Sequence, residues 1–233
     1  MPAGLVGGEL KAMGAKQAAV MNRDELLLAR RLGDYATRAP VAAMLSVLSA
    51  MIVLAISQQG RTTLWDVVCA VWLLGLGAIN ALRVSHAHRV EADTIDFRYI
   101  RRQVRRAERM AFGDSLGWAL GLAIIGPTLD YPARVTVGIL LTGMLATAAI
   151  ALRSLPRIGI SLTAAFMIGG CAAIYMRDQP GDLANVPIMI FYAAVILHCF
   201  RADGATYEAR FHAELTVSES AETIGLLLHD YEA

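Results

Sequence analysis

The sequence has few of the motifs and residue clusters that accompany common catalytic and metal chemistries. Its 233 residues contain neither a phosphate-binding GxxxxGK(S/T) loop nor a zinc-binding HExxH helix. The three cysteines, Cys69, Cys171 and Cys199, are far apart in the chain and have no CxxC spacing, which argues against disulfides and against a metal cluster. We therefore predict that this chain is not an enzyme and holds no metal.

The apolar segments also lack the alternation of apolar and polar residues that is typical of barrel strands. Each is close to the roughly 20 residues that a helix needs to cross a bilayer. With 56% hydrophobic residues and a mean hydropathy of +0.50, the chain is predicted to be an all-α polytopic membrane protein with six transmembrane helices. The six segments are residues 41–57, 64–82, 111–128, 133–152, 158–176 and 184–200.

Arginine is distributed unevenly between these segments. Of the 19 arginines, only Arg61, Arg134 and Arg177 lie in the first, third and fifth gaps. The positive-inside rule places the arginine-rich side in the cytoplasm, so both termini are predicted to be cytoplasmic. The arginines lie beside predicted membrane ends, where acidic lipid head groups are the expected partner, and no nucleic acid is predicted to bind.

The pattern divides the chain into three regions. Residues 1–39 form a cytoplasmic arm, residues 40–202 the six-helix membrane module, and residues 203–233 a polar, helix-prone cytoplasmic segment. Between Arg23 and Tyr35 the leucines gather near one helical face. This part of the arm is either an amphipathic helix on the inner membrane surface or a solvated lead-in to the first membrane helix.

The second gap, residues 83–110, contains no proline or glycine and repeats arginine every three or four residues. We predict that the second and third membrane helices extend into the cytoplasm here as a helical hairpin. Its arginines serve either as an orientation signal or as a surface for acidic lipid or a downstream domain.

Four polar residues fall inside the apolar segments. Asp66, Asn80, Asp114 and His198 are candidate intramembrane sensing residues, since ionisable groups at membrane depth are costly unless they are paired or hydrated. All four lie near the predicted interfaces, where Asp66 could pair with Arg61 and Asp114 with Arg109. No cofactor is predicted, although His198 together with His86 or His88 could in principle supply two axial ligands for haem.

The third apolar segment carries Gly113, Gly117 and Gly121 at intervals of four residues, which places all three on one face. Small residues at this spacing let two helices approach closely. The partner is either another helix of the same chain or a second copy of the protein.

The C-terminal segment carries apolar residues at alternating steps of four and three, which is the spacing of a coiled-coil seam. These residues are Val217, Ala221, Ile224, Leu228 and Tyr231. The pattern is still running at residue 233, and two heptads are too few to be stable alone. We therefore predict that this segment forms a homodimer and continues into output domains.

The six short-looped helices and residues 222–232 (ETIGLLLHDYE) together resemble the membrane-embedded N-terminal sensor modules of the MASE type. In bacterial signalling proteins these modules precede GGDEF and EAL domains. The resemblance implies an inner-membrane sensor that relays a membrane-derived stimulus to cytoplasmic domains of cyclic di-GMP turnover. A histidine kinase sensor module and a small transporter or channel are the alternatives.

Overall fold

The computed structural model describes residues 23–57, 63–90, 97–151, 154–177 and 182–232. Nearly all of these residues are helical, and none of them forms a strand. The helices are α3 (Arg23–Ser57), α4 (Thr63–His88), α5 (Phe97–Ile125), α6 (Tyr131–Ala151), α7 (Pro156–Arg177) and α8 (Asn185–Glu232), with short 3-10 turns at Gly126–Thr128 and Asp182–Ala184. The predicted all-α class is therefore confirmed for the described part of the chain.

The described part of each apolar segment lies within one helix, except that the third segment ends in the 3-10 turn Gly126–Thr128 and the sixth begins at the last residue of the 3-10 turn Asp182–Ala184. Five helices, α3, α4, α5, α7 and α8, are long and apolar enough to cross a membrane. Large apolar side chains such as Leu64, Leu74 and Phe191 point outward and are more than two-thirds exposed. An outward apolar surface of this extent is typical of a protein surrounded by lipid.

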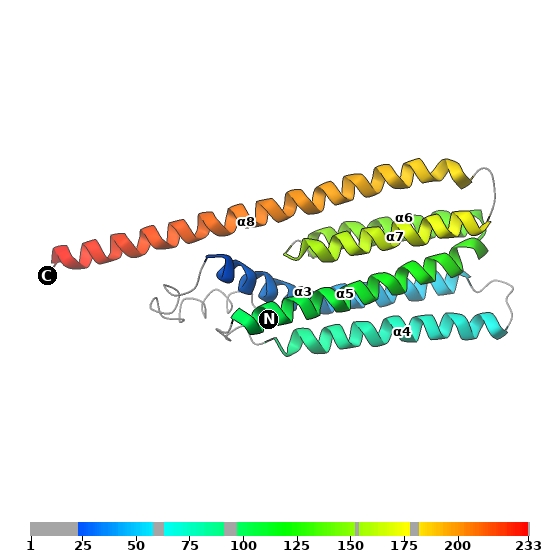
Figure 1. Cartoon of the computed structure of the whole chain (residues 1–233), viewed down its shortest axis with the longest axis horizontal. Coiled ribbons are helices and arrows are strands. Elements are labelled where there is room, and N and C mark those ends of the chain that lie inside the picture. The colour runs from blue at the N-terminus through cyan, green and yellow to red at the C-terminus, as the bar shows by residue number, and fades with distance from the viewer. Residues whose placement is uncertain (1–22, 58–62, 91–96, 152–153, 178–181, 233) are drawn as a thin grey trace.

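The helices lie side by side along the long axis of the molecule, and α8 extends far beyond the others (Figure 1). Helix α5 packs closely on α7, where Gly169 faces the backbone of Ala119. A Cβ at residue 169 would lie 2.7 Å from the Ala119 carbonyl oxygen, so only glycine allows this approach. A row of edge-to-face rings, Trp72, Trp118 and Phe166, joins α4, α5 and α7, with 5.6 Å between successive ring centroids.

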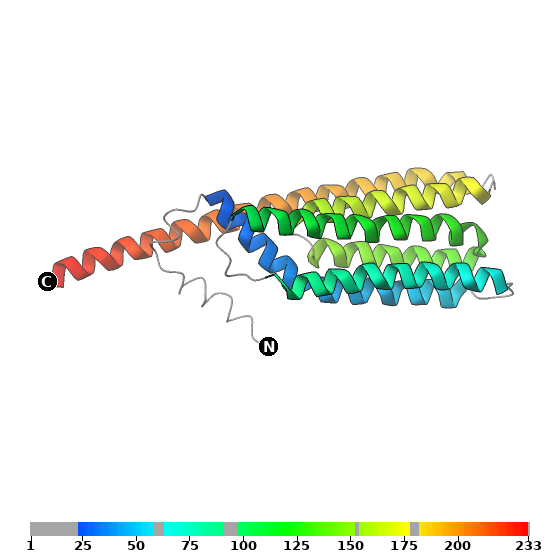
Figure 2. The ribbon, with the colours of Figure 1, turned by 60° about the horizontal axis from the view of Figure 1, so that its bottom comes forward.

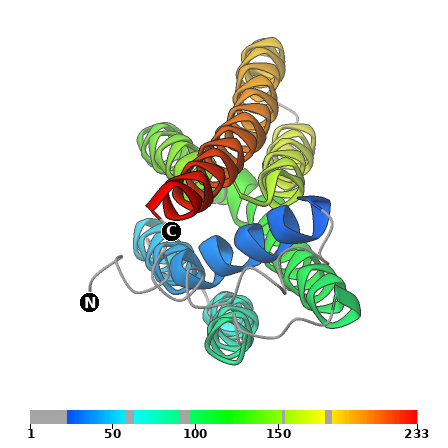
Figure 3. The same cartoon turned by 90° about the vertical axis from the view of Figure 1, so that its left-hand side faces the viewer.

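Helix α3 continues through Pro40, and its first part runs obliquely to the rest (Figure 2). A proline inside a helix removes one backbone hydrogen bond and bends the axis, which accounts for the change of direction. The first part of α3, residues 23–39, crosses the end of the bundle (Figure 3). It lies against the protein and contacts α8, which neither of the two sequence-based alternatives for the arm anticipated.

Both expected region boundaries fall inside continuous helices. Helix α3 runs through residues 39 and 40, and α8 runs through residues 202 and 203 without a break. The ends of α4 at His88 and of α5 at Phe97 are consistent with the helical hairpin predicted for the second gap. Residues 1–22 of the arm lie outside the described part of the chain.

Candidate functional site

A cluster of buried polar side chains lies where α3, α4 and α5 meet. We call Ser46 of α3, Asn80 and Arg83 of α4, and Asp114 of α5 the buried polar cluster. The four residues are between 1% and 4% exposed. Polar groups at this depth are costly unless they satisfy one another, so their arrangement determines what the cluster can do.

Asp114 is the centre of the cluster. Asn80 Nδ2 donates to its Oδ1 over 2.8 Å, and Ser46 Oγ donates to the same oxygen over 3.1 Å. Arg83 Nη1 lies 3.5 Å from the other carboxylate oxygen, Oδ2. Three helices are therefore joined through one carboxylate, and a change in its partners must change how these helices pack.

The predicted pairing of Asp114 with Arg109 is wrong, because Asp114 pairs with Arg83. Five residues separate Arg109 from Asp114 along α5, so their side chains leave the helix about 140° apart, while only residues three or four apart are neighbours. Arg109 is exposed, and Arg83 belongs to the buried end of α4 and not to a solvated gap. The presence of Asp114 in a membrane helix is therefore explained by a buried ion pair and not by its closeness to a membrane interface.

Two aromatic side chains complete the surroundings of the cluster. Arg83 Nε donates to the hydroxyl of Tyr35 over 3.1 Å, and Trp118 Nε1 donates to Ser46 Oγ over 2.9 Å. Sequence reasoning missed Tyr35, Ser46 and Trp118. Tyr35 and Ser46 are eleven residues apart, which is close to three full turns, and this spacing is the signal that could have placed both on one face of α3.

Some polar atoms of the cluster are not satisfied. Among the described residues, Asn80 Oδ1 and Arg83 Nη2 are buried without a hydrogen-bond partner. An unmade hydrogen bond at such a site costs about 1–3 kcal/mol. The cluster therefore has unused donor and acceptor capacity, which a rearrangement of the helices could satisfy.

The histidines considered for haem are not brought together. His86 is buried on α4, and its Nε2 lies 2.7 Å from Gln103 Oε1. His198 is exposed on α8, which lies on the opposite side of the bundle from α4 (Figure 3). His88 is exposed. A search of the described residues finds no group of three or more histidine, cysteine, aspartate or glutamate side chains placed to hold a metal.

Asp66 is exposed in the first turn of α4, away from the cluster. A carboxylate there is favourable because helix N-termini attract negative charge. Arg61, its predicted partner, lies outside the described residues.

The three glycines of α5 face α4. A Cβ at Gly117 would lie 2.7 Å from Leu76, one at Gly121 would overlap the Trp72 ring, and Gly113 faces Ile79 at ordinary contact distance. Trp72 Nε1 also donates to the Gly117 carbonyl over 2.7 Å. This arrangement favours the intramolecular alternative, because α4 already occupies the glycine face.

Residues 113–117 (GDSLG) match the GxSxG pattern of hydrolase nucleophiles in letters alone. In those enzymes the serine stands on a sharp turn between a strand and a helix. Ser115 lies in the middle of α5, and its hydroxyl donates to the Ala111 carbonyl over 2.9 Å. The segment therefore lacks the geometry of a nucleophile.

A second group of polar contacts joins the first part of α3 to α8. Arginines of α3 pair with glutamates of α8, and we call this set the clasp. Its pairs are Arg23 with Glu219, Arg30 with Glu214, and Arg31 with Glu208.

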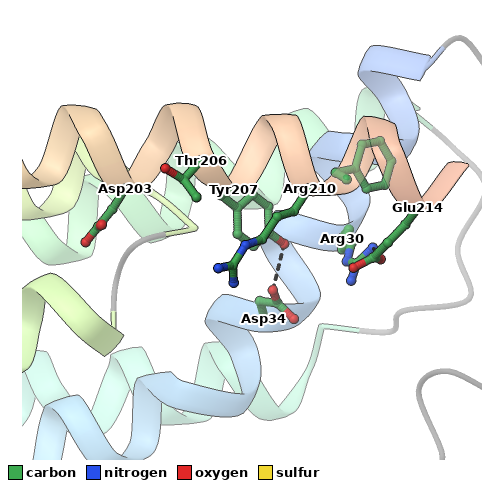
Figure 4. A pocket seen from close by; sticks show the side chains of 8 residues that line it. Arg30, Asp34, Asp203, Thr206, Tyr207, Arg210 and Glu214 are labelled. Carbon is green, nitrogen blue, oxygen red and sulfur yellow. Dashed lines mark hydrogen bonds and ion pairs between the residues drawn. The ribbon is translucent and has the colours of Figure 1, made fainter. Parts of the chain in front are cut away.

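Tyr207 strengthens the clasp, since its hydroxyl donates to Asp34 Oδ2 over 2.6 Å (Figure 4). Burial, the hydrogen bond to Asp34 and the charge of that carboxylate together hold the pKa of Tyr207 well above its ordinary value. The phenol therefore keeps the proton that it donates. Asp34 and Tyr35 are adjacent on α3, so the clasp and the buried polar cluster meet at neighbouring residues.

The apolar seam of α8 only partly avoids the clasp, because Glu214 precedes Val217 by three residues and Ala221 by seven and so borders the seam. Val217, Ala221 and Ile224 are exposed, while the side chains of Leu228 and Tyr231 lie outside what is described. Phe211, which is buried against the first part of α3, precedes Val217 by six residues and therefore points about 120° away from the seam. A partner on the seam would therefore lie beside the Arg30–Glu214 pair of the clasp.

Comparison of the chain with protein-family models, with curated proteins and with solved structures gives no match.

Proposed function

We propose that this chain is a membrane-embedded sensory input and dimerisation module, which relays a stimulus arising in the bilayer through α8 to cytoplasmic output domains. The observation that carries this proposal is α8 itself. It is one helix of 48 residues that begins among the membrane helices and continues well past them (Figure 1). A continuous helix transmits rotation or translation over its whole length.

The exposed seam supports a dimer. Val217 is 69% exposed and Ile224 is 58% exposed, on a segment otherwise rich in polar residues. Pairing with the same seam of a second copy would remove this apolar surface from water, which is favourable by roughly 25 cal/mol per Å². Because two heptads are marginal alone, the membrane helices would have to help hold the two copies together.

The clasp supports six crossings with both termini in the cytoplasm. Arg23 near the start of α3 pairs with Glu219 near the end of α8, so these two segments lie on the same side of the bundle. Two ends on one side require an even number of crossings. With five helices already suited to crossing, the sixth crossing falls to α6, whose 21 residues would span about 31 Å.

A path for the signal runs along α3. Rearrangement of the partners of Asp114 would move Tyr35, and the neighbouring residue Asp34 holds Tyr207 of α8. A stimulus that shifts the population from about 1:99 to 99:1 must favour one state by about 5.5 kcal/mol. Re-pairing of one buried charge and satisfaction of the two unpaired polar atoms are of the right order to contribute.

The expected output is cyclic di-GMP synthesis or hydrolysis, which rests on the resemblance of residues 222–232 and of the short-looped helices to MASE-type modules. The stimulus is expected to be a membrane property or a lipid-soluble molecule. Helix α8 would serve a histidine kinase in the same way, and the activity of fused output domains separates the two possibilities.

Disulfide cross-linking tests the dimer seam on which the relay depends. Cys69, Cys171 and Cys199 are first replaced, and cysteine is then placed at Val217 or Ile224, with exposed Thr223 as the matched control. Mild oxidation in membranes should give a covalent dimer through residues 217 and 224, and much less through residue 223. Equal cross-linking at all three positions, or none at any, would contradict the seam.

Transport is the second candidate, and the buried charge of Asp114 favours it, because ionisable residues at membrane depth often line ion pathways. The measurement is proton or ion flux into liposomes that contain the purified protein. Flux that disappears in Asp114→Asn would support transport and contradict the relay as the sole function.

A further inference from the structure

A basic pocket of about 330 Å³ lies between the first part of α3, the start of α5 and the connection from α6 to α7. Four guanidinium groups line it, those of Arg31, Arg101, Arg105 and Arg157, and one carboxylate, that of Glu108. Positive charge therefore exceeds negative charge among the lining side chains. A concave surface with this balance attracts anions.

The arginines of the pocket differ in how they are compensated. Arg157 lies 3.7 Å from Glu108, and Arg31 pairs with Glu208 of α8. Among the described residues, no acidic side chain forms an ion pair with Arg101 or Arg105. The Nε of Arg31 is buried and has no hydrogen-bond partner there. At least three arginines thus retain donors for a further anion.

The position of the pocket indicates what kind of anion it can take. Val104 lies about two turns before residue 111, where the apolar part of α5 begins, and Leu155 directly precedes α7. Together with Leu28 these side chains form an apolar wall beside the arginines. The pocket therefore lies at the boundary between polar and apolar surface, on the arginine-rich side of the protein.

We propose that this pocket binds the phosphate group of an acidic phospholipid. Arginine forms paired, charge-assisted hydrogen bonds with phosphate, and basic pockets beside the cytoplasmic ends of membrane helices suit acidic head groups. The apolar wall would accommodate the first carbons of the acyl chains. This binding does not depend on whether α8 relays a signal.

Arg31 also links the pocket to the clasp, and this part of the inference rests on the proposed function. The same guanidinium lines the pocket and pairs with Glu208 in the clasp. A phosphate group in the pocket competes with Glu208 for Arg31 and weakens the hold of α3 on α8. Acidic lipid would then shift the relay toward the state with an open clasp.

The binding test is titration of the detergent-purified full chain, with the thermal unfolding midpoint as readout. The probes are dioctanoyl phosphatidylglycerol, dioctanoyl phosphatidylcholine and inorganic phosphate. The test variant is Arg101→Gln with Arg105→Gln. The matched control is Arg102→Gln with Arg106→Gln, which removes the same charge at the same spacing from exposed positions outside the pocket.

Phosphatidylglycerol should raise the midpoint of the wild type and of the control, and its apparent affinity should fall about tenfold or more in the test variant. Tenfold corresponds to about 1.4 kcal/mol, which is within the range expected for one charge-assisted hydrogen bond. Midpoints without lipid show whether both variants fold.

An equal response to phosphatidylcholine, or undiminished affinity in the test variant, would overturn the proposal. If inorganic phosphate saturates the same response, the site takes a free phosphate and the lipid assignment is overturned.

Glu208→Gln tests the coupling separately. Removal of this carboxylate leaves Arg31 without its competing partner, so phosphatidylglycerol should bind several-fold more tightly. Unchanged affinity would overturn the competition for Arg31 while leaving the binding site in place. Failure of the dimer seam, on which the proposed relay depends, would be seen in the cross-linking, so the three outcomes remain distinguishable.

Discussion

At the scale of single residues, Asp114 and Arg83 are tolerated in the bundle because each compensates the other. Their exposed fractions are 4% and 3%. A buried ion pair contributes little net stability, since the cost of removing two charges from water offsets most of their attraction. Removing only one of the two side chains leaves the other charge buried and unpaired, which lowers the stability much more than the intact pair raises it. This difference can be measured.

Asp114→Leu or Arg83→Met alone should lower the free energy of unfolding by about 3–5 kcal/mol, because each leaves one buried charge unpaired. The double variant should lose less stability than the two single variants combined, since no buried charge remains unpaired, but it should stay below the wild type because Asn80 and Ser46 lose their buried acceptor. Denaturant unfolding in detergent micelles measures all four proteins. If the losses of the single variants simply add in the double variant, the two side chains are not coupled as described.

At the scale of helices, the contact between α3 and α8 depends on several weak interactions. The ion pairs Arg23 with Glu219 and Arg30 with Glu214 involve exposed side chains, and such pairs contribute only about 0–1 kcal/mol each. The half-buried Tyr207 adds a charge-assisted hydrogen bond to Asp34. A contact assembled in this way is weak enough that a change in one or two of its charges should open it.

Arg30→Glu should open the clasp in part, because it places two negative charges opposite each other. Spin labels on cysteines at exposed Asp24 and Ser218, in a protein without its native cysteines, report the distance between α3 and α8. The distribution should shift to longer distances in Arg30→Glu. Combining it with Glu214→Arg should restore the original distribution. If the distance distribution is the same in the wild type and in both variants, these charges do not hold α3 against α8.

At the scale of the whole molecule, the apolar outer surface and the unequal arginine distribution are the basis of the proposed orientation. Arg134 is one of only three arginines in the alternate gaps, and it lies near Asp130, at the end of the bundle opposite the clasp. The clasp holds the start of α3 and the later part of α8 at the other side. Under the proposed topology, residue 130 faces the outside of the cell and residue 218 faces the cytoplasm.

Asp130→Cys should react with a membrane-impermeant maleimide in intact spheroplasts, whereas Ser218→Cys should react only after lysis. Both positions are exposed, so access by the reagent and not burial decides the result. Asp24→Cys should behave as Ser218→Cys does. Opposite behaviour of residues 24 and 218 would indicate an odd number of crossings and would contradict both the clasp and the six-helix topology.

The positions of the helices could be predicted from the sequence, because each apolar segment has the length and composition of a membrane helix and lipid offers backbone amides no other partner. The ends of the helices were less predictable. The expected boundary at residue 40 falls inside α3, since Pro40 bends the helix without ending it. Asn80 and Asp114 were identifiable as candidates from their types and depth alone.

The sequence by itself thus determined the all-helical class, the apolar outer surface and two members of the buried polar cluster. Only the tertiary structure decided the partners. Asp114 pairs with Arg83 and not with Arg109, and the arm of α3 lies on α8, because both contacts depend on how separate helices are rotated and displaced relative to one another. Hydropathy and spacing describe one helix at a time and contain no information about that rotation.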